Sequence, residues 1–190
     1  AVEHRQHHWL ATIFGTDLFA PLMDMVPESV HVVARRVLAD HTRAIAFLLS
    51  DGVRPSNKEA GYILRRLMRR IILYETRYNL DKNLLEKMLG RTIEIYGEHY
   101  GELRKNEAVI LEEFKREQDK FRKLLVGGLK RIRELIELKK KNNFAVRMTP
   151  DFGSKSTHYV NLISGREAFD IYQSYGIPPE LIQEELAQNA

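Results

Sequence analysis

The sequence predicts an all-α, mostly helical fold, a helical bundle with one long helix and a small β-hairpin near residues 144–162. Only six prolines and eleven glycines interrupt the 190 residues. Between them, apolar side chains recur at intervals of three and four, which is the helical period. Hydrophobic residues make up 44% of the chain and charged residues 29%, which is typical of a globular protein with a buried core.

Six helices are expected in the first three quarters of the chain. Their ranges are about 3–13, 17–25, 28–50, 57–77, 80–98 and 101–141. Ser56 and Glu59 have capping-box spacing, so they predict the start of the fourth helix. The last helix carries a long apolar stripe, which Gly127-Gly128 interrupts. We therefore expect it to pack on a neighbouring helix of the same chain and not to form a free coiled coil.

Turn-forming residues between 142 and 163 break the helical pattern, and the sequences FAVRM and THYVNLI on either side of them suit a hairpin. Ser164 and Glu167 then form a second capping-box pattern, followed by a helix stop at Gly176 and a helix start at Pro178-Pro179.

Three parts are predicted from this organisation. They are a helical domain (1–141), a turn or hairpin insertion (142–163) and a C-terminal helical element that completes the domain (164–190).

Composition excludes several kinds of site. Without any Cys, the chain forms no disulfide, thiolate zinc site or cysteine nucleophile. Among the seven histidines, His4, His7 and His8 could share a helix face but have no acidic partners in a metal-ligand pattern, and His41, beside Asp40, is expected to be buried or capping. No Gly-rich phosphate loop or Ser/His/Asp set is present, so no catalytic or metal site is expected.

The chain is expected to be cytoplasmic. No apolar run approaches the ~18 residues that a membrane-spanning helix needs. The first residues, AVEHRQHHWL, lack the pattern of a secretory signal.

Basic residues gather in two blocks of a chain with net charge +4. Residues 35–82 and 100–150 each carry a net +6, whereas 1–34 carry −3 and 151–190 carry −4. This distribution suggests a surface that faces a polyanion. Charged runs are, however, more often solvated helix faces.

The expected helix 57–77 is amphipathic, with an almost wholly cationic face opposite an apolar one. The cationic face carries Lys58, Arg65, Arg66, Arg69, Arg70 and Arg77. Guanidinium groups suit phosphate oxygens, and a helix start, here next to Asn57, favours anions. The pattern predicts that the arginines bind a nucleic-acid backbone while Asn57 contacts the edges of the bases. The alternative is an internal salt-bridge lattice with the acidic ends of the chain.

Several runs resemble the alanyl-tRNA synthetase family just beyond its catalytic domain. The main runs are ADHTRAIAFLLSDGVRPSN (39–57) and GYILRRLMRR (61–70). Shorter ones are TDLF (16–19), FRKLLVGGL (121–129) and AFDIYQSYGIP (168–178). The resemblance covers nearly the whole chain, and residues 142–163 match least.

This resemblance implies the family's tRNA-recognition middle domain, which grips the tRNA(Ala) acceptor stem and reads its G·U wobble pair. ATP and Mg belong to the class II catalytic domain, which would lie upstream, so no cofactor is expected in this chain. The chain would be part of an alanine-tRNA ligase but inactive alone. Its expected partners are tRNA(Ala) and the catalytic domain, in cis or as a separate subunit, and no membrane.

The resemblance also implies which residues read the wobble pair. Asn57 is one, and the second is an acid on the helix after Ser164. That second place holds Gln173, and Asp170 lies three residues earlier as a substitute. Ala60 stands where the family commonly has arginine. Two other functions stay open: a helical scaffold that docks on the catalytic domain, and a stand-alone RNA-binding module.

Overall fold

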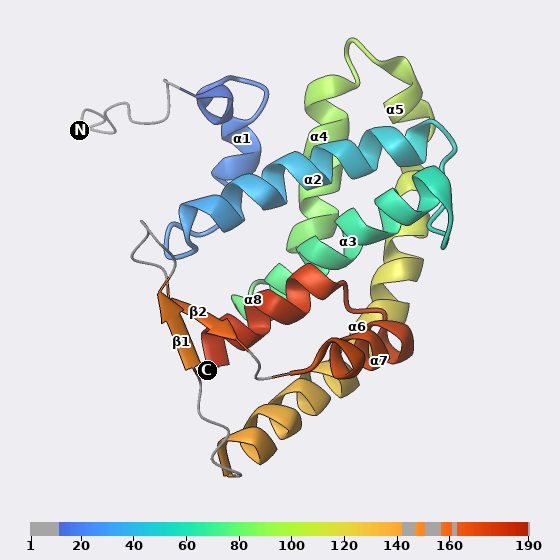
Figure 1. Ribbon diagram of the computed structural model, residues 1–190. Helices are drawn as coiled ribbons and strands as arrows, with labels where there is room; N and C mark the ends of the chain where they lie inside the picture. Colours follow the sequence, from blue (N-terminus) through green and yellow to red (C-terminus); the bar gives the residue numbers. More distant parts are fainter. Residues whose placement is uncertain (1–11, 142–146, 151–156, 161–162, 190) are drawn as a thin grey trace, which may run out of the picture. The chain divides into compact units, whose positions relative to one another are not determined.

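The computed structural model describes residues 12–141, 147–150, 157–160 and 163–189 (Figure 1). Helices dominate this part of the chain, which confirms the predicted all-α class. The chain forms two compact units, Ala1–Asp119 and Lys120–Ala190. The division falls inside one continuous helix, α6 (Glu107–Lys141), so no loop marks it in the sequence. The domain boundaries predicted at residues 142 and 164 do not coincide with this division. The three-part organisation stays a prediction.

The first unit is built around α2, which packs against α1, α3, α4 and α5. Its elements are η1 (Ile13–Gly15), α1 (Ala20–Met23), α2 (Val32–Ser50), α3 (Glu59–Arg77), α4 (Leu84–Tyr96), α5 (Gly101–Lys105) and the start of α6. The facing sides of α2 and α3 are apolar: Leu38, Ile45, Leu64, Met68 and Ile71 are fully buried. Burial of these side chains is the main term that stabilises the unit.

Helix boundaries in this unit differ from the predicted ones. α2 begins at Val32, four residues later than predicted. The His31 ring Nδ1 accepts from the Val33 N–H (3.3 Å) and caps the helix there. The helix expected over 101–141 breaks at Asn106, whose amide donates to the Ser50 carbonyl (3.0 Å). α1 covers four residues of the range expected to be helical, and the helix predicted at 3–13 lies mostly outside the described residues.

The capping box predicted from Ser56 and Glu59 is wrong. α3 starts at Glu59 itself, after Lys58, so Glu59 is not three residues into the helix as the motif requires. Ser56 Oγ instead accepts from the Lys58 N–H (3.2 Å) and donates to the Lys58 carbonyl (2.9 Å). Glu59 has a φ of +49°, in the left-handed region. The helix start therefore lies two residues later than the pattern predicts.

The second unit contains the rest of α6, a hairpin, α7 (Gly165–Tyr175) and α8 (Pro179–Asn189). β1 (Arg147–Pro150) pairs antiparallel with β2 (Thr157–Val160), which confirms the predicted hairpin. The second capping box is also confirmed: Ser164 Oγ accepts from the Glu167 N–H (3.2 Å), and the Glu167 carboxylate accepts from the Ser164 N–H (2.7 Å).

The glycine pair in α6 lies where the end of α7 approaches that helix. A Cβ on Gly128 would overlap Ile177 Cδ1 and lie 3.0 Å from Tyr175 Cβ. Gly176 ends α7 with a φ of +63°, as predicted. The apolar stripe of α6 is therefore packed within the chain, with Leu125 and Ile132 buried. No helix in the described part of the chain is long and apolar enough to cross a membrane.

Candidate nucleic-acid interface

Residues 51–58 connect α2 to α3, and α3 closely holds the last six of them, the 53–58 loop. The Ser56 N–H donates to the Gly61 carbonyl (3.0 Å). A Cβ on Gly61 would overlap both Ser56 Oγ and the carbonyl oxygen of Arg54. Arg54 Nη1 in turn donates to the Leu49 carbonyl at the end of α2 (3.3 Å). The 53–58 loop is thus attached to both helices that flank it.

Asn57 is exposed at the end of the 53–58 loop, and its amide is held by Arg65 from two turns along α3. Arg65 Nη1 donates to Asn57 Oδ1, and Arg65 Nη2 donates to the Pro55 carbonyl (3.0 Å). Arginine has donors only, so it binds the oxygen end of the amide. The NH₂ group and one lone pair of the oxygen are left for another partner.

Arg65 and Arg69 both bind Glu117, a carboxylate of α6 whose side chain is only 6% exposed. Arg69 Nε and Nη2 each lie 3.0 Å from Glu117 Oε1, and Arg65 Nε lies 3.5 Å from the same oxygen. A buried carboxylate needs such partners, since burying it unpaired would cost several kcal/mol. For these two arginines the structure favours the internal ion-pair alternative, with a partner on α6.

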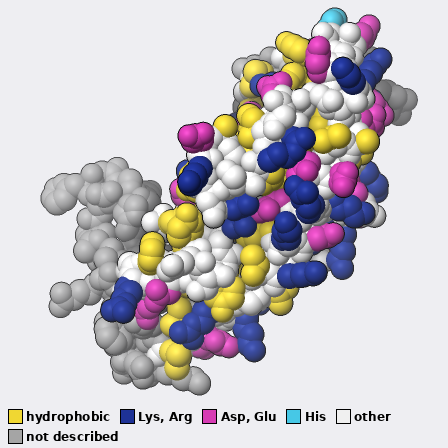
Figure 2. All heavy atoms as spheres, turned by 90° about the vertical axis from the view of Figure 1, so that its right-hand side faces the viewer, with side chains coloured by type: hydrophobic (Ala, Val, Ile, Leu, Met, Phe, Trp, Pro, Cys, Tyr) yellow, Lys and Arg dark blue, Asp and Glu magenta, His cyan; other side chains and the backbone are white. Residues whose placement is uncertain are grey.

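The other predicted backbone-binding cations differ in their exposure. Lys58 is exposed, and Arg66 and Arg70 are half-buried. The Arg70 guanidinium lies 5.8 Å from the ring centroid of Tyr74, and this cation–π contact orders it. Figure 2 shows that Lys and Arg side chains on the face drawn are interspersed with Asp and Glu. The charged surface on this face is therefore mixed in sign.

Two polar residues of α2, Arg43 and His41, pack against side chains of the first unit. The Arg43 guanidinium lies 5.5–5.7 Å from the ring centroids of Phe19, Phe47 and Tyr96. His41 is largely buried, as expected, and its Nδ1 lies 3.1 Å from Asp40 Oδ2. Burial lowers the pKa of His41, and the hydrogen bond to Asp40 opposes that shift.

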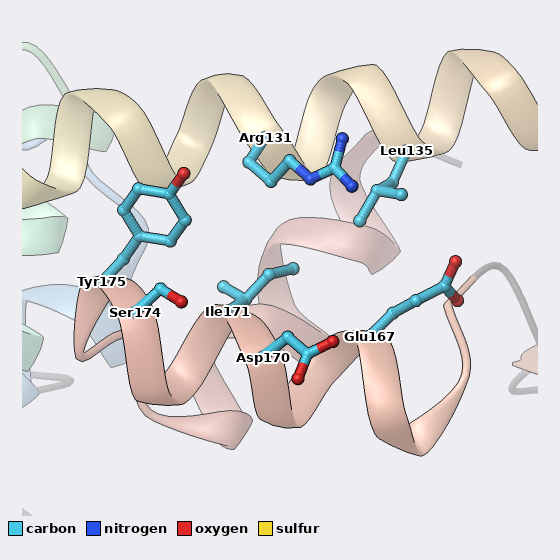
Figure 3. Close-up of a pocket in the computed structure, with 7 residues that line it drawn as sticks. All are labelled: Arg131, Leu135, Glu167, Asp170, Ile171, Ser174 and Tyr175. Atoms are coloured by element: carbon cyan, nitrogen blue, oxygen red, sulfur yellow. The ribbon is translucent and has the colours of Figure 1, made fainter.

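The second predicted contact lies on α7, in the other unit. Asp170 and Gln173 are both exposed there. Asp170 lines a pocket of about 140 Å³, to which α6 contributes Arg131 and Leu135 (Figure 3). The other residues that line it, all from α7, are Glu167, Ile171, Ser174 and Tyr175. This volume is below the roughly 300 Å³ of small-molecule sites, so the pocket is not a ligand site of that kind.

Comparison with known proteins places the chain in a family. The family model for class II (A) tRNA synthetases matches residues 8–190. The chain belongs to the alanyl-tRNA synthetase family. Alanine–tRNA ligases of Desulfitobacterium hafniense, Mesorhizobium japonicum and Bacillus subtilis are 35%, 34% and 33% identical to it. The matches cover 94%, 93% and 91% of this chain, but 20%, 19% and 19% of those proteins. The chain thus spans about a fifth of the length of these relatives.

One residue of the candidate interface in this synthetase chain, Glu117, was not predicted from the sequence. Glu117 lies between Phe114 and Phe121 on the apolar stripe of α6, three residues after one and four before the other. Because a carboxylate on a buried helix face must find a cationic partner, this position was a usable signal. In the described part of the chain no group of three or more His, Asp or Glu residues is placed to hold a metal ion.

Proposed function

We propose that this chain is the tRNA-recognition segment of an alanyl-tRNA synthetase, which grips the tRNA(Ala) acceptor stem and reads its G·U wobble pair. The observation that carries the proposal is the exposed amide of Asn57, held in a defined orientation at the start of α3. Family membership supports tRNA as the class of ligand.

The chemistry of the wobble pair suits this amide. Side chains cannot read the deep, narrow major groove of an RNA stem, so a stem pair is read from the minor groove. There the guanine 2-amino group of a G·U pair is less engaged than in G·C. Asn57 Oδ1 retains a lone pair that accepts from this amine, and its NH₂ group donates to the uracil carbonyl.

The second contact comes from α7. Gln173 accepts through its amide oxygen but carries no charge, so its hydrogen bond is weaker than that of a carboxylate. Asp170 carries the charge and is exposed one turn earlier on the same helix. Replacing each residue in turn by alanine and measuring the loss of the G·U preference decides which of them makes the second contact.

The phosphate backbone is bound by the cations at and beyond the start of α3. Lys58, Arg66 and Arg70 fill this role, and each phosphate that they neutralise makes binding more salt-dependent. The role is not extended to Arg65 and Arg69, whose guanidinium groups bind Glu117. Arg66→Ala should weaken all acceptor stems alike and reduce the salt slope by about one unit.

Alanylation itself is the work of a class II catalytic domain outside these 190 residues, in cis or as a separate subunit, and that domain holds ATP and Mg. The 190-residue chain should therefore bind tRNA(Ala) but form no alanyl-adenylate. Incubation with ATP and alanine, followed by pyrophosphate exchange, tests this. Robust exchange would contradict the proposal.

The reading role is tested with acceptor-stem RNA duplexes that differ only in G·U against G·C. Asn57→Ala should abolish the preference for G·U with little loss of general affinity. Gln173→Ala should reduce it by about 1 kcal/mol, as for a neutral hydrogen bond. A larger loss from Asp170→Ala would move the second contact to Asp170.

Asn83→Ala is a matched control for this series, because Asn83 is also an exposed asparagine next to a helix start and makes no side-chain cap bond. It should leave the preference unchanged. Full discrimination by Asn57→Ala would remove Asn57 from the reading role.

A helical scaffold that docks on the catalytic domain is the second candidate. It is favoured by the cluster of Arg65, Arg69 and Glu117, in which two of the predicted RNA-binding arginines stabilise the fold. Absence of tRNA binding, together with binding to an isolated catalytic domain, would favour the scaffold.

A further inference from the structure

Arg65 makes three different contacts through its three guanidinium nitrogens. Nη1 donates to the side-chain oxygen of Asn57, and Nη2 donates to the backbone carbonyl of Pro55 (3.0 Å). Nε faces Oε1 of the buried Glu117 at 3.5 Å. One side chain therefore connects the 53–58 loop to the packed side of α6.

We propose that Arg65 is a positioning residue, which sets the orientation of the Asn57 amide, and that Glu117 holds Arg65 in place. The expected effect on RNA discrimination rests on the proposed function. The positioning itself is a property of the protein without RNA.

The orientation matters because the two ends of an amide have opposite chemistry. An asparagine rotated by half a turn would present an oxygen where the uracil carbonyl requires a donor. Arg65 offers only donors, so it stabilises the orientation in which the oxygen faces α3 and the NH₂ group faces away. An amide that is ordered before RNA arrives also loses less rotamer entropy on binding.

Glu117 is the group on which this arrangement depends. Arg65 and Arg69 are four residues apart on α3, so their like charges repel unless a carboxylate lies between them. Glu117 is buried and binds both, whereas a neutral glutamine compensates neither charge. Loss of the negative charge should release Arg65 and, with it, Asn57.

Arg65→Lys separates positioning from phosphate contact. Lysine keeps the positive charge, but its single nitrogen cannot reach Asn57, Pro55 and Glu117 as the guanidinium fork does. We expect the G·U preference to fall about fivefold, the factor equivalent to one neutral hydrogen bond of about 1 kcal/mol. Affinity for the G·C stem and the salt slope should stay as in the wild type. A retained preference with an altered salt slope would overturn the proposal in favour of phosphate contact.

Glu117→Gln should lower the preference in the same direction. Its control is Glu94→Gln, which removes a carboxylate from an exposed pair with Arg91 on α4 and should change nothing. Thermal unfolding of each variant reports any general loss of structure. Arg65→Lys alone still tests the proposal if Glu117→Gln does not fold.

Side-chain NMR of the full chain tests the positioning without RNA. The Asn57 NH₂ group should have a high ¹⁵N order parameter in the wild type and a low one in Arg65→Lys, while that of Asn83 stays unchanged. An Asn57 order parameter that Arg65→Lys leaves unaltered would overturn the proposal. If the wild type shows no G·U preference, the proposed function fails, and this measurement still decides the role of Arg65.

Discussion

Gly61→Ala tests whether the 53–58 loop is as closely packed on α3 as the structure shows. The new Cβ would overlap Ser56 Oγ and the Arg54 carbonyl oxygen and lie 2.9 Å from Ser56 Cβ. Rotation of Ser56 relieves one of these contacts, but the Arg54 oxygen belongs to the backbone. The loop must therefore move as a whole, and its hydrogen bond from the Ser56 N–H to the Gly61 carbonyl weakens.

Two opposing effects set the change in the free energy of unfolding that Gly61→Ala causes. Overpacking typically costs about 1–3 kcal/mol, and the involvement of backbone puts this site in the upper part of that range. Alanine is a better helix former than glycine by up to about 1 kcal/mol. We therefore expect Gly61→Ala to lower the free energy of unfolding by about 1–2 kcal/mol. Because the displaced loop carries Asn57, the preference for G·U stems should fall as well.

Gly90→Ala on α4 is the matched control, because nothing lies within 4 Å of the added Cβ. It should raise the free energy of unfolding by about 0.5–1 kcal/mol. Urea denaturation followed by far-UV circular dichroism measures both variants. If Gly61→Ala is stabilised as much as Gly90→Ala, the loop does not contact α3 at this position and the reasoning is refuted.

Three further predictions concern local stability. Glu59→Gly should raise the melting temperature, because the left-handed φ of +49° costs a residue with a side chain roughly 1–2 kcal/mol, more than the entropic cost of glycine; a lower melting temperature would contradict this. Ser164→Ala should remove the capping box of α7 and about 1 kcal/mol of stability, measured by chemical denaturation, whereas Ser164→Thr should retain most of it. Burial lowers the pKa of His41 below 6.5, so the folded protein binds fewer protons than the unfolded one and loses stability as the pH falls through that region. His41→Gln should therefore lose less stability than the wild type between about pH 7.5 and 5.5, measured by thermal unfolding, and an equal loss would show that His41 does not contribute.

Local patterns in the sequence predicted much of the fold. The apolar spacing predicted α2, α3 and α6, and Ser164, Glu167 and Gly176 predicted both ends of α7. These features involve residues a few positions apart, whose interactions form within one turn of helix. Asn57 and the basic face of α3 were also evident from sequence, because residue type and helical period are sufficient to place them.

Only the tertiary structure decided what those side chains contact. Glu117 binds Arg69 across 48 residues of sequence, and the break at Asn106 depends on Ser50, 56 residues away. α3 starts at Glu59, and not at residue 57 as predicted, because the 53–58 loop packs on Gly61. In the first two cases the contact joins distant segments, and its free energy outweighs a local preference of about 1 kcal/mol. In the third the contact joins Gly61 to Ser56 and Arg54, close in sequence, through loop packing that residue spacing does not specify. Such a contact exists only once the helices are packed, which is why helical period and spacing predicted the cationic face of α3 but not the orientation of Arg65 and Arg69 toward α6.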